Sequence, residues 1–110
     1  MKKEIVTIIT AITGDRIIVG RNELYHAMRH FSLPEDIFLE LLERILKEPD
    51  EIYVDELTNT KEYRYFYKII QVKYILVIIK VIKEGFFFAS MYTTGTRIRN
   101  AHIKLKKLKI

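Results

Sequence analysis

Three residues in the first third of the chain have side chains suited to handling a phosphodiester. His26, Arg29 and His30 are three and four residues from one another in the pattern that brings side chains together on a helix. An imidazole can take up and release a proton near neutral pH, and a guanidinium offers several N–H donors to phosphate oxygens. RNA cleavage needs little more, because a base removes the 2′-hydroxyl proton, the oxygen attacks phosphorus and an acid protonates the leaving oxygen.

Other interpretations of these three residues stay open. They also fit a solvated polar face without a function, and a His-x-x-x-His spacing permits metal binding. A clear third metal ligand is missing, since His102 is distant in the sequence and the carboxylates are scattered. We therefore expect no metal and no cofactor. The chain has no cysteine, which excludes disulfides, thiolate metal ligands and cysteine nucleophiles.

The apolar residues around these side chains predict the helix that carries them. They recur at i, i+3, i+4 and i+7, at Leu24, Ala27, Met28 and Phe31. Asn22 precedes them and is a suitable N-cap. At about 100° per residue, the two histidines and the arginine fall on the side of the helix opposite the apolar stripe. We therefore expect them to face away from the core.

A second helix and a set of strands are predicted in the rest of the chain. Ser32-Leu33-Pro34-Glu35 matches a capping box with proline in the first turn, and the apolar stripe that follows ends before Pro49. Strands are expected at 5–12 and 16–19, joined as a hairpin by Thr13-Gly14-Asp15, and then at 52–54, 62–71, 74–82 and 86–92. The expected loops cover 58–60 and 93–99, and an edge strand is expected at 103–105.

The order of these elements predicts one α+β domain over residues 1–110. An N-terminal β-hairpin and two helices would pack on an antiparallel, twisted β-sheet. The nearly continuous apolar run at 74–82 is typical of a central strand that is covered on both faces. A chain of 110 residues can bury one core of this kind.

Basic residues are concentrated in the second half of the chain. Residues 1–55 carry seven Lys/Arg and eleven Asp/Glu, a net −4, whereas residues 56–110 carry twelve and three, a net +9. A basic region of this kind suits a phosphate backbone, although a lysine-rich solvated surface gives the same pattern. The candidate RNA contacts are Arg64, Lys68, Arg99, Lys104, Lys106 and Lys107.

Composition also bears on location and source. The apolar stretches are far shorter than the roughly 20 residues of a membrane span, so no membrane partner is expected. Met1-Lys2-Lys3 is basic but no small-residue cleavage site follows, so a strand is expected there in place of a signal peptide. A cytoplasmic location fits these features. The chain has many Ile, Lys and Glu residues but only one glutamine, Gln71. This composition is typical of thermophile proteins and equally of proteins from AT-rich genomes.

The order of the motifs resembles the barnase–EndoU–colicin–RelE-like nucleases, in particular small domains of phages, mobile elements and toxin systems. The resemblance covers roughly residues 15–99. It rests on His26-Ala27-Met28-Arg29-His30, a following helix, Glu48-Pro49-Asp50-Glu51-Ile52, Glu62–Lys68, Leu76-Val77-Ile78-Ile79-Lys80 and Phe87-Phe88-Ala89-Ser90-Met91-Tyr92-Thr93-Thr94. Met91 stands where the family usually has alanine, a change without an expected effect on the chemistry.

The resemblance implies a metal-independent endoribonuclease that produces a 2′,3′-cyclic phosphate. His26 would be the principal acid and base, and Arg29 and Lys80 would contact or neutralise the phosphate. Tyr92 and Thr94 would orient the phosphate or the 2′-hydroxyl. Alternatively, Tyr92 and Thr94 only pack in the sheet, and Lys80 is a residue at a strand end whose ammonium reaches solvent.

Further implications concern His30, Arg97 and the partners. His30 is either a second catalyst or a structural residue bonded to the second helix, and one of Arg97 and Arg99 would lie near the site. RNA is the implied partner, together with a cognate antitoxin or immunity protein if the chain is a toxin and not a mobile-element enzyme. The tyrosine stripe at 63, 65 and 67 fits either base stacking or sheet packing.

Two functions of other classes remain compatible with the sequence. One fold hosts many functions, so a nucleic-acid-binding module that does not cleave its ligand could have the same sequence features. A viral structural or assembly protein is the other alternative. Loss of RNA cleavage with retained binding in a His26→Ala variant would separate an enzyme from the binding module, and strong self-association without salt-dependent RNA binding would indicate the assembly protein.

Overall fold

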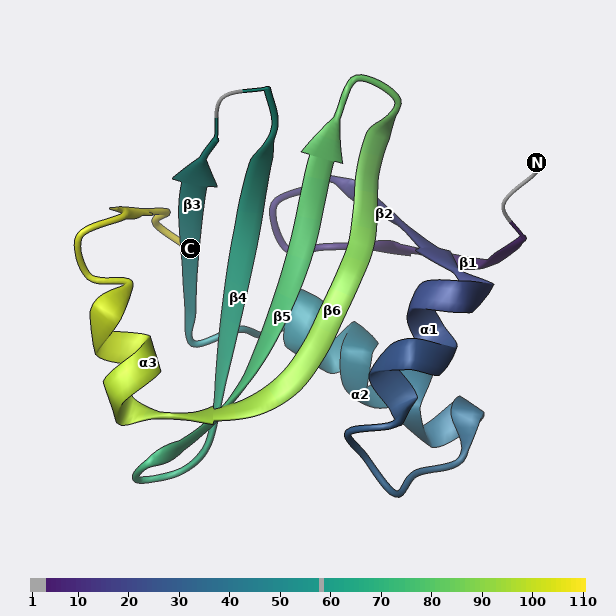
Figure 1. Ribbon diagram of the computed structural model, residues 1–110, viewed down its shortest axis with the longest axis horizontal. Coiled ribbons are helices and arrows are strands. Elements are labelled where there is room, and N and C mark those ends of the chain that lie inside the picture. Colours follow the sequence, from purple (N-terminus) through teal and green to yellow (C-terminus); the bar gives the residue numbers. More distant parts are fainter. Residues whose placement is uncertain (1–3, 58) are drawn as a thin grey trace.

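The structure, a computed structural model, describes residues 4–57 and 59–110. The basic start at residues 1–3 and Thr58, the first residue of the loop expected at 58–60, lie outside the described residues. In the described part, seven strands and three helices form an α+β fold, the class that the sequence predicts (Figure 1). None of these helices is both long and apolar enough to cross a membrane.

The elements follow one another along the chain with short connections. They are β1 (Ile5–Thr10), β2 (Arg16–Gly20), α1 (Arg21–Met28), α2 (Glu35–Lys47), β3 (Glu51–Glu56), β4 (Lys61–Ile70), β5 (Lys73–Ile82), β6 (Gly85–Gly95), α3 (Thr96–Ala101) and β7 (Lys106–Lys107). The strands form one sheet in the order β1-β2-β6-β5-β4-β3-β7, so β5 is central, as its apolar sequence predicts.

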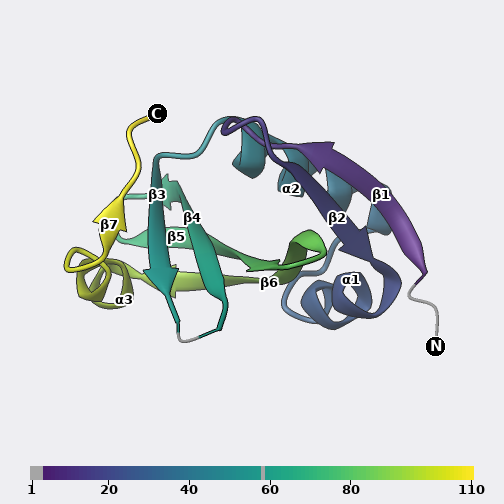
Figure 2. The ribbon, with the colours of Figure 1, turned by 90° about the horizontal axis from the view of Figure 1, so that it is seen from above.

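One parallel pair joins the two halves of this sheet. The other neighbouring strands are antiparallel, including the β1–β2 hairpin and the run from β3 to β6. β2 instead pairs with β6 in parallel, with Ile17 opposite Phe86 and Ile18 opposite Phe87. The hairpin therefore continues the sheet beyond β6 and brings α1, which follows β2 directly, beside that strand (Figure 2).

The main core lies between α2 and one face of the sheet. α2 contributes Phe38, Leu42, Ile45 and Leu46, all fully buried, and these pack with Ile75, Val77 and Ile79 of β5. Alternate residues of a strand point to opposite faces, so the remaining residues of β5 face away from α2. Figure 1 shows α2 behind the sheet, with α1 and α3 at its two sides.

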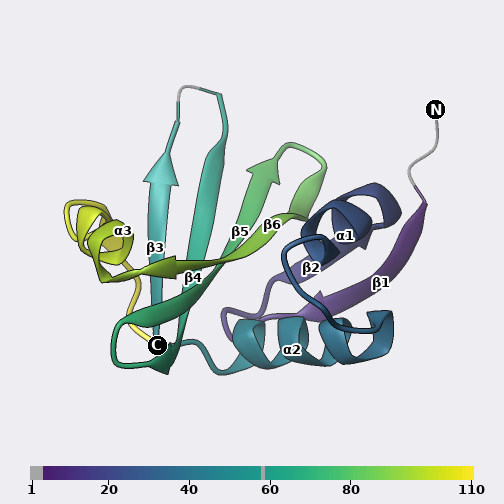
Figure 3. The same ribbon diagram turned by 60° about the horizontal axis from the view of Figure 1, so that its bottom comes forward.

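The face turned away from α2, here called the open face, is only partly covered. It carries Leu76, Ile78 and Lys80 of β5 opposite Tyr92, Ser90 and Phe87 of β6. Near α3 it holds a small buried cluster of Tyr53, Phe66, Tyr74 and Leu76, whereas Lys80 at the other end is exposed. The prediction that β5 is covered on both faces is thus correct for only part of the strand. Figure 3 shows α1 and α3 on opposite flanks of these strands.

Two helix starts differ from the sequence prediction. Asn22 was expected as an N-cap, but α1 begins at Arg21 with Gly20 as its N-cap. The reason is that sheet pairing continues to Gly20 and the N–H of Arg21 still donates to the carbonyl of Glu4, which leaves no linker before the helix. α2 begins at Glu35 after Pro34, whose extended ψ of 158° keeps Ser32 out of a capping position.

The C-terminal segment also differs from its prediction. Residues 93–99 do not form a loop, because β6 pairs with β5 as far as Gly95 and the chain then forms α3. Tertiary contacts hold this polar helix, since Arg99 pairs with Glu51 and the C-cap His102 contacts Arg64, as described below. The edge strand is at Lys106–Lys107 and not at 103–105, because these two residues pair with β3.

We predict that Leu24→Ala lowers the free energy of unfolding by about 2–5 kcal/mol, because the Leu24 side chain of α1 is fully buried in the core. The matched control is Asn22→Ala, which removes an exposed side chain from the first turn and should change stability by less than about 0.5 kcal/mol. Urea unfolding followed by circular dichroism measures both. A loss of about 1 kcal/mol in Asn22→Ala would show that Asn22 caps the helix after all.

Candidate active site

α1 presents its imidazole side toward the open face because its other side is anchored in the core. Leu24 and Ala27 are buried to 1% exposure or less. His26, Arg29 and His30 are exposed, as the helical spacing predicts. The rotation of α1 about its axis is therefore set by apolar burial.

Three aromatic side chains meet where α1 ends beside β6. The ring centroids of His26 and His30 lie 6.3 Å apart, and those of His30 and Tyr92 lie 6.2 Å apart. α1 ends at Met28, and the N–H of His30 donates to the carbonyl of Ala27, so the last turn is tight. His30 thus lies between the ring of His26 and the ring of Tyr92, and we call these three residues the imidazole–tyrosine cluster.

The strand register places the other predicted residues relative to this cluster. Thr94 is two residues beyond Tyr92 on the same face of β6, about 7 Å away along the strand. Lys80 is four residues from Leu76, the partner of Tyr92, so it lies about 13 Å along β5 from that pair. Lys80 and Thr94 are therefore too far apart to hold the same phosphate group.

Lys80 and its neighbour on the open face, Phe87, line a cavity. The cavity has a volume of about 260 Å³, and Glu23, Gly20, Phe87 and Ala89 are among the residues that line it. It sits where α1 starts and where a bulge interrupts the pairing of β6 with β5. β-Bulges are common next to active sites because they redirect side chains.

Arg64, one of the predicted RNA contacts, is surrounded by partners within the protein. Its Nη2 lies 2.9 Å from Glu62 and 3.0 Å from Asp55, and its Nη1 lies 3.0 Å from Nε2 of His102. The Nδ1 of His102 in turn lies 2.8 Å from the carbonyl oxygen of Ile98. The guanidinium of Arg64 thus links β4 to β3 and α3, and two carboxylates locally neutralise its charge.

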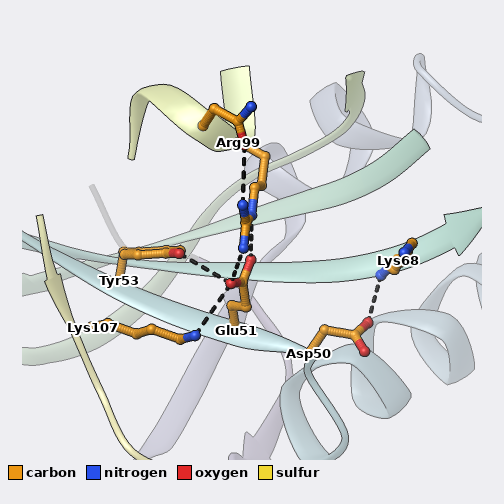
Figure 4. A network of polar contacts seen from close by, with 7 residues as sticks. Asp50, Glu51, Tyr53, Lys68, Arg99 and Lys107 are labelled. Carbon is orange, nitrogen blue, oxygen red and sulfur yellow. Dashed lines mark hydrogen bonds and ion pairs between the residues drawn. The ribbon is translucent and has the colours of Figure 1, made fainter. Parts of the chain in front are cut away.

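Arg99 belongs to a second internal network, which is centred on Glu51 (Figure 4). Its guanidinium forms a two-point ion pair with the buried carboxylate of Glu51, and its Nε donates to Oε1 at 2.7 Å. The hydroxyl of Tyr53 and the ammonium of Lys107 contact the same carboxylate at 3.1 and 3.3 Å. Hydrogen bonding by Arg99 holds the pKa of Glu51 at about 2, well below the usual 4.5.

The Glu51 network ties three separate segments together. Arg99 belongs to α3, Lys107 to β7 and Glu51 to β3, so the ion pairs fix α3 at the side of the sheet. Sequence reasoning gave Glu51 no role of its own. Its only signal was its position after Pro49-Asp50 at the start of a strand, whereas its partner is 48 residues away.

The remaining predicted cations are solvent-exposed. They are Arg29, Arg97, Lys68, Lys104 and Lys106. Neither Arg29 nor Arg97 forms an ion pair with another residue in the ranges that the structure describes, so both guanidiniums are available to an anion. The tyrosine stripe packs against the main core: Tyr65 is fully buried, Tyr63 and Tyr67 are partly buried, and burial raises the pKa of Tyr65 to about 12.

No group of three or more His, Cys, Asp or Glu residues is arranged to hold a metal ion in the described part of the chain. A family model described as "phage-Barnase-EndoU-ColicinE5/D-RelE like nuclease2" matches residues 1–109. The chain belongs to this nuclease family. The match confirms the resemblance inferred from the motifs and spans nearly the whole chain, so the imidazole–tyrosine cluster and the open face lie inside the matched region. No curated protein and no solved structure matches the chain.

We predict that the ion pair of Glu51 stabilises the fold in a pH-dependent way. The folded-state pKa of about 2 lies below the ordinary value of 4.5, so this stabilisation is complete above about pH 5 and is lost as the pH falls toward 2. Glu51→Gln should lower the free energy of unfolding by roughly 3 kcal/mol at pH 7. The difference between the variant and the wild type should shrink steadily in urea titrations at pH 5, 4, 3 and 2.

The control for this experiment is Glu43→Gln, which breaks an exposed ion pair with Lys47 and should change stability by less than about 1 kcal/mol. A constant difference between Glu51→Gln and wild type from pH 7 to pH 2 would contradict the assignment.

Proposed function

We propose that this member of the nuclease family is a metal-independent endoribonuclease, which cleaves RNA by 2′-hydroxyl attack and leaves a 2′,3′-cyclic phosphate. The observation that supports this most directly is the imidazole–tyrosine cluster at the edge of the open face. The hairpin and the first two helices packed on the sheet would be this chain's version of the nuclease fold.

The two imidazoles have the chemistry for both proton transfers. One neutral ring removes the proton of the 2′-hydroxyl, and one protonated ring donates a proton to the leaving 5′-oxygen. Centroids 6.3 Å apart allow the rings of His26 and His30 to reach different oxygens of one phosphate. We assign His26 as the principal acid and base and His30 as its partner, because the ring of His30 lies beside that of Tyr92 and, within the described residues, its side chain forms no hydrogen bond with α2.

The neighbouring groups would bind the phosphate. The hydroxyl of Tyr92 and, one position further along the same face, that of Thr94 can donate to its oxygens. Arg29 follows the helix directly, and its guanidinium is the nearest unpaired cation in sequence to both histidines. Charge developing on the phosphate in the transition state is stabilised most by donors that are already in place.

More distant cations would hold the rest of the RNA. Lys80 lies too far along β5 from Thr94 to share its phosphate, so we assign it to the adjoining nucleotide. Lys68, Arg97, Lys104 and Lys106 are exposed and would contact the backbone without regard to sequence. Arg64 and Arg99 would act indirectly, since their guanidiniums hold the sheet and α3 together.

We predict that the wild-type protein degrades total RNA in EDTA and that His26→Ala reduces the rate by about 10²–10⁴-fold, the usual contribution of one acid–base group. Mass spectrometry of the product ends should show 2′,3′-cyclic phosphates. Binding of the same RNA, measured by fluorescence anisotropy, should be unchanged. Tyr25→Ala is the matched control because it alters the neighbouring exposed residue of α1, and its activity should be close to wild type.

Three results would contradict the proposal. Loss of wild-type cleavage in EDTA would indicate a metal-dependent nuclease. If His26→Ala kept wild-type activity, the imidazole–tyrosine cluster would not take part in the cleavage. Binding without cleavage in the wild-type protein would favour the nucleic-acid-binding module.

A further inference from the structure

The cavity at the start of α1 has walls suited to a flat, aromatic group. Besides Phe87, it is lined by Ile5, Ile18 and Ala89, which are apolar. It forms because the parallel pairing of β2 with β6 stops at Ile18 and Phe87, and the bulge in β6 follows at once. The volume of about 260 Å³ is slightly below the range of drug-sized pockets and suits one small ring system.

A carboxylate and an ammonium are the polar groups of this cavity. Glu23 is half-buried, and no hydrogen bond or ion pair joins its carboxylate to another residue within 4–57 or 59–110. Lys80 also lines the cavity and is exposed. A half-buried carboxylate without a partner is an acceptor available to a ligand that carries N–H groups.

Gly20 gives the Glu23 carboxylate its position. A Cβ at residue 20 would collide with Oε1 of Glu23, so the side chain folds back over the glycine. Gly20 has φ of −88°, an ordinary value for any residue, so an alanine here would be accommodated by moving the Glu23 carboxylate, the far end of a flexible side chain. In this arrangement Glu23 is half-buried and lines the cavity.

The cavity lies next to the catalytic groups that we assign. Glu23 and His26 are three residues apart on one side of α1, which separates them by about 4.5 Å along the helix axis. A nucleotide whose phosphate lies at His26 therefore has its base, or that of its neighbour, within reach of Glu23. Lys80 is then close to the nucleotide whose base enters the cavity, and it is not close to the reacting phosphate.

We propose that this cavity binds the nucleobase next to the cleaved phosphodiester and that Glu23 makes it selective for guanine. Guanine has two adjacent donors, N1–H and the N2 amino group, that one carboxylate can accept together, and an O6 acceptor beside them for the ammonium of Lys80. Adenine, cytosine and uracil lack that pair of adjacent donors. This inference rests on the ribonuclease function proposed above and adds its base preference.

The test uses DNA oligonucleotides that contain a single ribonucleotide, so that only one bond can be cleaved by 2′-hydroxyl attack. The base on either side of that bond is varied among guanine, adenine, cytosine, uracil and hypoxanthine, which lacks the N2 amino group. The wild-type protein should cleave the guanine substrate roughly tenfold faster or more than the other three standard bases, with hypoxanthine intermediate. This comparison is made by kcat/KM in EDTA.

Two variants locate the preference at the cavity. Glu23→Gln should reduce the guanine preference to within about twofold by lowering kcat/KM on the guanine substrate more than on the other three bases, and Gly20→Ala should act in the same direction because it displaces the carboxylate. Glu40→Gln, an exposed carboxylate on α2 away from the open face, is the matched control and should keep the preference. Circular dichroism confirms that each variant is folded.

The outcomes separate this inference from the function on which it rests. Equal wild-type rates on the four bases, or an equal loss on all of them in Glu23→Gln, would overturn it, the second by making Glu23 part of the chemistry. If the wild-type protein cleaves nothing, the ribonuclease proposal fails. The cavity is then tested by binding of guanosine 3′-monophosphate against the other three nucleotides, followed by amide NMR shifts at Gly20, Glu23 and Ala89. Equal binding or no binding would overturn the inference.

Discussion

The parallel pairing of β2 with β6 is the constraint on which the candidate site depends. Only two residue pairs form it, Ile17 with Phe86 and Ile18 with Phe87. They bring the N-terminal hairpin against a strand nearly 70 residues later, and α1 follows β2 without a linker. Because α1 must then bury Leu24, its imidazole side can only face the edge of the open face, where Tyr92 lies. The same geometry opens the cavity, since β2 leaves β6 immediately after these pairs.

The opposite flank of the open face is held by a different kind of interaction. α3 buries none of its own residues, and the ion pair between Arg99 and Glu51 holds it to β3 instead. Desolvation of Glu51 is offset by four donors from Arg99, Tyr53 and Lys107, which is the condition under which a buried carboxylate stays charged. One flank thus depends on apolar burial and the other on electrostatics, so acid should loosen the α3 side first.

The orientation of α1 and the central position of β5 could be predicted from the residues of each element alone. The 3.6-residue period separated Leu24 and Ala27 from His26 and His30, and the burial of α1 agrees with it. The continuous apolar run identified β5 as the central strand. The motif order suggested the nuclease family that the comparison confirms.

Features that depend on distant contacts could not be read in the same way. α3 is too polar to be predicted as a helix, because it is held by the ion pair with Glu51 of β3 and not by an apolar stripe. Arg64 and Arg99 looked like free cations, since the carboxylates that neutralise them are recognisable only after the strands are paired. Glu23 drew no attention because a glutamate in a first helical turn is ordinary, and only the bulge in β6 places a cavity beside it.

The most direct measurement is a crystal structure of the protein with an RNA dinucleotide whose attacking 2′-hydroxyl is replaced by hydrogen, so that it binds but cannot be cleaved. The account predicts that the phosphate lies within hydrogen-bonding distance of His26 or His30 and of the hydroxyl of Tyr92, on the open face between α1 and β6. A phosphate bound instead along the C-terminal lysines, with the imidazole–tyrosine cluster facing only solvent, would contradict it.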